Sequence, residues 1–160
     1  MIIYKVGGGA ILLLSTLIFY RQSIKFEKAK LSQLDGFIML VCHIKRNIEA
    51  YLMPIEQIIS ICDRKIFDLI GLPETYEYSA RSSPLDNVEI YIDDKSIESL
   101  RYFFSSLGQG YCEESIKLCE RVENDLRAHR SELAASCEKS RKVRLTVSLS
   151  LSATVILLFI

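Results

Sequence analysis

The chain has 160 residues, enough for one domain, and its 20 Lys and Arg residues balance its 20 Asp and Glu residues. A nucleic-acid-binding protein needs a clustered basic excess, so this balance argues against that class of function. Every charged side chain except Lys5 lies between Arg21 and Arg144, so a charged middle separates two nearly uncharged ends.

The first uncharged segment predicts a transmembrane helix over residues 1–20. The 19 residues from Ile2 to Tyr20 are long enough to cross roughly 30 Å of hydrocarbon, with Lys5 extended toward the interface. The following sequence RQSIKFEKAK is basic and contains no small-x-small cleavage site. A retained membrane anchor therefore fits better than a cleaved signal peptide.

Two helices are predicted next, as an antiparallel hairpin. Apolar residues recur at helical spacing over 31–52, and the pattern resumes over 54–71. Pro54 suits the first turn of the second helix, Gly71 suits its C-terminal cap, and Pro73 follows as a stop signal.

The segment 74–93 has no single clear pattern. Ser83, Pro84 and Asp86 fit the cap and first turn of a short helix, whereas the alternation over 88–92 is typical of a strand. Because no partner strand is evident, a helix is favoured.

Two further helices complete the charged middle. Asp94 can cap a helix that ends near Leu107, and Gly108 and Gly110 form an interhelical turn. No Gly or Pro follows Gly110, so one helix of about 50 residues, roughly 75 Å long, is predicted from Tyr111 into the C-terminal segment.

Residues 145–160 predict a second transmembrane helix. Polar and apolar residues alternate over 146–153 as in a strand, but an edge strand ending in VILLFI would expose an apolar edge, which proteins avoid. Ser and Thr hydroxyls can bond to helix carbonyls in a membrane, and the basic run KSRKVR precedes the segment.

Basic residues flank both predicted spans on their inner sides, and such residues mark the cytoplasmic side. The sequence therefore predicts a cytoplasmic domain over 21–144 and termini on the other side. The expected fold is all-α, a membrane-anchored antiparallel helical bundle between N- and C-terminal transmembrane helices. The flanking residues are Arg21, Lys25, Lys28, Lys30, Lys139, Arg141, Lys142 and Arg144.

No motif for catalysis, cofactor binding or metal binding is present in the sequence. The histidines, His43 and His129, lie far apart on or beside apolar helical faces, and no pair of cysteines has C-x-x-C spacing. We therefore expect a non-enzymatic protein without a cofactor. The cysteines are interpreted as small apolar residues in a reducing compartment: Cys42, Cys62, Cys112, Cys119 and Cys137.

Residues 73–98 are acidic, with seven acids against Arg81 and Lys95. The simplest interpretation is a solvated face turned away from an anionic membrane surface. The sharper hypothesis is a docking surface for a basic cytoplasmic partner, centred on Asp93, Asp94 and Glu98.

The order of these features resembles the stage III sporulation protein AB family. The resemblance rests on the N-terminal span, the hairpin with Pro54, the sequence SIESLRYFFSSLGQGYCEESIKLCERVENDL, the basic run and the terminal span. Members typically have a helix ending in Leu-Gly, here Leu107-Gly108, then a polar turn and a long helix into the membrane. This chain departs from the family in the turn, where Gly110-Tyr111 replaces a Ser-Asp type cap, and in the irregular segment 74–93.

The resemblance implies a subunit of the channel complex that links mother cell and forespore in endospore formation. Its cytoplasmic domain would be similar to the helical domain of the type II secretion platform protein and would couple a secretion-type ATPase to the membrane assembly. The implied partners are that ATPase, other membrane subunits and lipid, in an oligomeric assembly. The alternative is a two-span membrane sensor or scaffold with a helical interaction domain.

Overall fold

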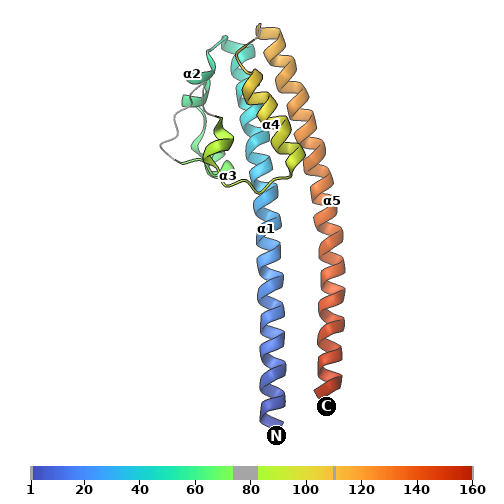
Figure 1. The fold of residues 1–160 in the computed structure, drawn as a ribbon. Helices are drawn as coiled ribbons and strands as arrows, with labels where there is room; N and C mark the ends of the chain where they lie inside the picture. Colours follow the sequence, from blue (N-terminus) through green and yellow to red (C-terminus); the bar gives the residue numbers. More distant parts are fainter. Residues whose placement is uncertain (1, 74–82, 110, 160) are drawn as a thin grey trace. The chain divides into compact units, whose positions relative to one another are not determined.

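The computed structural model describes residues 2–73, 83–109 and 111–159. For some of these residues it describes the backbone alone, namely 2–13, 16, 17, 19, 87, 145, 148, 149, 151–153 and 155–159. The described residues contain five α-helices and one 3₁₀-helix and no strand, which confirms the all-α class. The helices are α1 (Ile2–Tyr51), α2 (Ile55–Ser60), α3 (Arg64–Ile70), the 3₁₀-helix η1 (Pro84–Asn87), α4 (Asp94–Ser106) and α5 (Cys112–Phe159) (Figure 1).

The chain divides into two compact units, residues 1–28 with 133–160 and residues 29–132. In the second unit, α1 and α5 pack antiparallel, as two ion pairs between them show. Asp35 pairs with Arg130, and Lys45 pairs with Glu120. The apolar faces of all the helices in this unit meet in one core. Its fully buried members include Leu34, Phe37, Val41, Ile44, Ile58, Ile70, Leu100, Phe103, Cys119 and Leu126.

The prediction of a single helix over 54–71 was wrong, because the segment forms α2 and α3 with a break between them. Asp63 has an extended backbone and its carboxylate accepts a hydrogen bond from the Lys65 amide at 3.0 Å, so it caps the start of α3. Pro54 lies directly before α2 rather than within its first turn. The predicted cap at Gly71 is confirmed, with a left-handed φ of 91° and an N–H donated to the Phe67 carbonyl.

The helix predicted to begin after Ser83 and to include Leu85, Val88 and Ile92 is shorter than expected, because only the 3₁₀ turn η1 forms there. Ser83 and Asp86 form a capping box, in which the Asp86 carboxylate accepts from the Ser83 amide and the Ser83 hydroxyl accepts from the Leu85 amide. Residues 88–93 belong to neither a helix nor a strand. Residues 74–82, part of the segment with no clear pattern, lie outside the described residues.

The predicted cap at Asp94 was wrong by one residue, because α4 begins at Asp94 itself and its cap is Asp93. Gly108 has a left-handed φ of 84°, in agreement with a turn after Leu107, while Gly110 lies outside the described residues. The long helix predicted from Tyr111 begins one residue later and continues to Phe159, so this prediction is confirmed.

In the first unit, the terminal parts of α1 and α5 run antiparallel, with both chain ends at the same end of the pair (Figure 1). Arg144 forms an ion pair with Glu27 and donates to the Ser23 hydroxyl. Among the residues that the structure describes, no helix has a stretch long and apolar enough to cross a membrane. Most side chains of 1–20 and 145–160 lie outside that description, and the two spans stay a prediction.

Candidate interaction surfaces of the helical bundle

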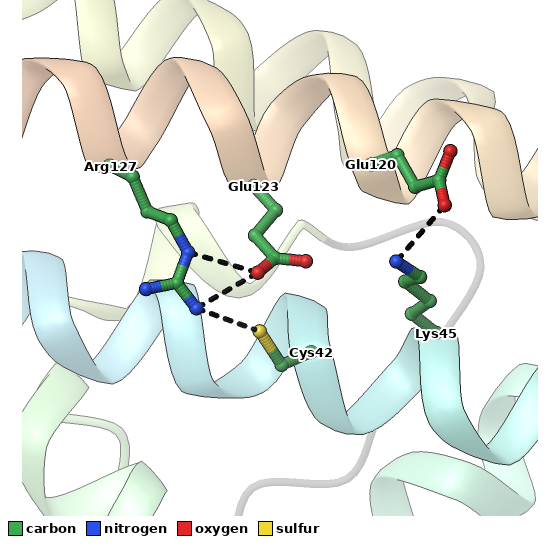
Figure 2. Close-up of polar contacts among 5 residues, drawn as sticks. All are labelled: Cys42, Lys45, Glu120, Glu123 and Arg127. Atoms are coloured by element: carbon green, nitrogen blue, oxygen red, sulfur yellow. Dashed lines mark hydrogen bonds and ion pairs between the residues drawn. The ribbon is translucent and has the colours of Figure 1, made fainter.

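Polar side chains form a line of contacts between α1 and α5 (Figure 2). Arg127 contacts Glu123 at 2.9 Å, and one of its terminal nitrogens lies 3.8 Å from the Cys42 sulfur. The Lys45 ammonium lies 3.1 Å from the Glu120 carboxylate. Each cation faces an anion, and such exposed pairs contribute about 0–1 kcal/mol each. Arg127 and Glu123 both lie on α5, so only the Lys45–Glu120 pair and the Arg127–Cys42 contact join the two helices, and they add little to stability.

The five cysteines are free thiols. Burial raises the pKa of Cys62 to about 11 and that of Cys119 to about 12. Burial, together with the Glu123 carboxylate, also raises the pKa of Cys42. A high pKa suppresses the reactive thiolate, so these three residues act as small apolar side chains.

Both histidines contact neighbouring elements of the bundle. The Nε2 atom of His43 lies 3.3 Å from the Ile58 carbonyl oxygen, and Nδ1 of His129 lies 3.1 Å from the Ser96 hydroxyl. Ser96 is fully buried and donates its proton to Asp93 at 2.8 Å, so the hydroxyl supports a helix cap and is not oriented as a nucleophile toward the histidine. In the part of the chain that the structure describes, no three His, Cys, Asp or Glu side chains gather as a metal site would require.

The three acids proposed as a partner surface have different surroundings. Burial alone would raise the pKa of Asp93, but hydrogen bonds from Ser96 outweigh it and hold the pKa below its usual value. Asp94 is exposed in the first turn of α4, and Glu98 lines a shallow groove together with Lys95 and Arg121. The surface therefore mixes both signs of charge around Glu98, and Asp93 serves the fold.

The residues predicted to flank a membrane lie along α1 and α5. Arg21, Lys25, Lys28, Lys139 and Arg141 are exposed. Lys142 is exposed and pairs with Glu138 one helical turn earlier, at 3.0 Å. Lys30 and Arg144 are partly buried, and Arg144 contacts Glu27 and Ser23.

Two open grooves in the bundle were not predicted from the sequence. The first, of about 550 Å³, lies between the ends of α1, α2, α4 and α5, and we call it the end groove. The second, of about 870 Å³, lies between α1, α3 and α5 and includes Met39, Arg46, Arg127 and Arg130. Arg127 and Arg130 are paired with Glu123 and Asp35, so much of the positive charge of this second groove is neutralised.

Grooves formed by residues far apart in the sequence give no local pattern. The one sequence signal was the apolar Leu52, which continues the apolar pattern over 31–52 but is 73% exposed at the end groove.

Comparison with known proteins finds no matching family model, no matching curated protein and no matching solved structure.

Proposed function

We propose that this chain is a non-enzymatic platform subunit of a channel complex like the one that links mother cell and forespore in endospore formation. The uncharged ends cross the membrane, and the helical bundle lies in the cytoplasm. There the bundle couples a secretion-type ATPase to the membrane assembly, as the resemblance to the stage III sporulation protein AB family implies.

Support for the membrane arrangement comes from the pairing of Arg144 with Glu27 and Ser23. Because this contact joins the basic flank of one uncharged segment to that of the other, the two flanks lie at the same level of the α1–α5 pair. Two helices that enter a bilayer together from one side need this arrangement, with cationic side chains in a band at the interface. The contact is the observation that favours two paired spans over one span and a surface strand.

Topology is the first test of the proposal. We would replace Cys42, Cys112 and Cys137 by Ser and introduce Asn124→Cys on the exposed face of α5. The remaining thiols, Cys62 and Cys119, are buried and have raised pKa values, so they should label slowly. A membrane-impermeant maleimide should leave intact cells unlabelled and should modify the new cysteine once the cells are opened. The protein should also stay in the membrane pellet after alkaline carbonate extraction.

The same background without Asn124→Cys measures labelling of the two native thiols. Labelling of intact cells would put the bundle outside and favour the sensor or scaffold alternative. Release into the carbonate supernatant would contradict the two spans, whichever side the bundle occupies.

The proposed ATPase contact is tested by reversing charge where the fold is least affected. Asp94→Lys with Glu98→Lys leaves the Asp93 cap in place, and we expect co-purification with the secretion-type ATPase of the same cell to fall at least tenfold. Close charge pairs at interfaces have coupling energies of about 1.5 kcal/mol or more, and 1.4 kcal/mol is about a factor of ten.

The matched control is Asp68→Lys with Glu132→Lys, which makes the same change in net charge at exposed residues of α3 and α5. Unchanged capture in the first variant would show that Asp94 and Glu98 do not contact the ATPase. Equal losses in both variants would indicate a non-specific effect of net charge.

A further inference from the structure

The end groove is an open depression at one end of the 29–132 bundle, lined by both apolar and polar side chains. The apolar residues that line it come from four helix ends and the connections beside them. They are Ile48, Leu52, Met53, Ile55, Phe104 and Leu107. Helix-in-groove recognition needs an open apolar channel of this kind, in which a partner can bury the apolar stripe of a helix.

Leu52 lines the end groove, and Tyr51 and Tyr111 are the chain neighbours of the lining residues Leu52 and Cys112. Leu52 is 73% exposed, Tyr51 is 66% exposed and Tyr111 is 84% exposed. Leu52 also has a positive φ of 50°, a left-handed conformation that a branched side chain rarely adopts. Both its conformation and its exposure are unfavourable for the isolated bundle, and backbone strain of this kind is typical of binding sites.

The same end of the bundle is negatively charged. The segments 47–57 and 102–116 contain Glu49, Glu56, Glu113 and Glu114 and no Lys or Arg. All four carboxylates are exposed, and Glu56 lines the groove itself. Arg46, Arg101 and Lys117 directly flank these segments, so Glu56 is the charged residue that lines the groove, while Glu114 lines a neighbouring groove with Lys117 and Arg121.

The helix ends add to this negative potential. α1 and α4 both end at the groove, and neither has a basic residue in its last turn to offset its free carbonyl groups. The acids of α2 and α5 stand in the first turns of those helices, where they offset the positive ends of the dipoles. Cations are thus favoured at the C-terminal ends of α1 and α4.

From the apolar residues that line the groove, the strained and exposed Leu52, and the single charged lining residue Glu56, we propose that the end groove docks a cationic amphipathic helix of a protein partner. The apolar stripe of that helix lies against Leu52 and the other apolar lining residues, and its Lys and Arg side chains reach Glu56 and the free carbonyl groups of α1 and α4. Anionic lipid is disfavoured by the same charges, and so is a second copy of this end, whose glutamates would face their equivalents. The proposal stands on described residues of the bundle and does not depend on the proposed membrane spans or the sporulation channel.

Cys112 lines the end groove and reports its occupancy directly. We would measure maleimide labelling of Cys112, Cys42 and Cys137 in the full chain in a neutral detergent, by mass spectrometry of each site. The probe is a Leu-Lys peptide of about four helical turns with one apolar face. At about ten times its Kd, labelling of Cys112 should slow about tenfold, since only the free fraction reacts, while Cys42 and Cys137 keep their rates.

Two variants test whether the protection of Cys112 from maleimide depends on binding of the peptide in the end groove. Leu52→Asn removes the apolar side chain and places there a residue that tolerates a left-handed backbone, so the bundle should remain folded while protection is lost. Glu49→Lys with Glu56→Lys should also abolish protection, whereas Asp68→Lys with Glu132→Lys should not.

Three results would overturn the proposal. The first is no protection of Cys112 by the Leu-Lys peptide. The second is equal protection by a Leu-Glu peptide of the same pattern, or by vesicles of anionic lipid. The third is protection that rises with the concentration of the chain alone, which would identify the occupant as a second copy.

Discussion

Replacing Gln33 by Ala is expected to lower the free energy of unfolding of the 29–132 bundle by about 3–5 kcal/mol. Gln33 is 2% exposed, and its Nε2 donates to the carbonyl oxygens of Ile70 at 2.9 Å and Glu89 at 2.8 Å. Its Oε1 accepts from the Tyr91 amide at 2.8 Å. Truncation leaves three backbone groups without their partner, and each unsatisfied buried group costs about 1–3 kcal/mol.

Hydrogen exchange gives this prediction a local measurement, because the Tyr91 amide donates to Gln33 and should exchange faster in the variant. Gln33→Glu should be at least as destabilising, since a carboxylate would face two carbonyl oxygens without a proton to donate. Gln57→Ala, on the exposed side of α2, is the control and should change stability by no more than about 0.5 kcal/mol. A loss below about 1 kcal/mol for Gln33→Ala would mean that water replaces the amide at all three groups.

The apolar periodicity of the sequence predicted much of the core. The spacings that placed Ile38, Val41, Leu100, Phe103 and Leu126 on helical faces correspond to side chains that are buried together. Periodicity indicates which face of a helix is apolar, and in a helical bundle that face packs against the other helices in the core.

Periodicity could not predict the break between α2 and α3. Ile58, Cys62, Ile66 and Ile70 follow one another at intervals of four, as they would in a single helix. All four are buried, so the break does not change the pattern of burial. The available signal was Asp63, a residue type that favours the start of a helix, where it caps α3.

The candidate sites depended on contacts that local sequence does not encode. Gln33 was a polar residue within an apolar helix, and its acceptors lie 37 and 56 residues further along the chain. Leu52 continued the apolar stripe of its helix, yet α1 ends at Tyr51 and the backbone turns the side chain outward. The cap formed by Asp93 is by contrast a local contact with Ser96, and the sequence pattern placed it one residue later, at Asp94.

Gly36→Ala is expected to destabilise the bundle by about 1–3 kcal/mol, although Ala is favoured over Gly inside a helix by about 1 kcal/mol. A Cβ atom on Gly36 would lie 2.9 Å from the Leu69 Cβ and from the Ile70 Cγ1, and 3.1 Å from the Ile70 backbone nitrogen. These distances are shorter than ordinary van der Waals contact, so α1 and α3 would have to separate.

Separation of α1 and α3 has its own cost, because Gln33, one turn before Gly36, holds the Ile70 carbonyl at 2.9 Å. We therefore expect Gly36→Ala to cost less in the Gln33→Ala background, with a coupling energy of about 0.5–3 kcal/mol in a double-mutant cycle. Asn124→Ala on the exposed face of α5 is the control and should be neutral or slightly stabilising. If Gly36→Ala instead raised the free energy of unfolding by about 1 kcal/mol, the helix-propensity gain would be acting alone. That result would mean that α1 and α3 are not in close contact at Gly36, and that the hydrogen bond from Gln33 to the Ile70 carbonyl is absent as well.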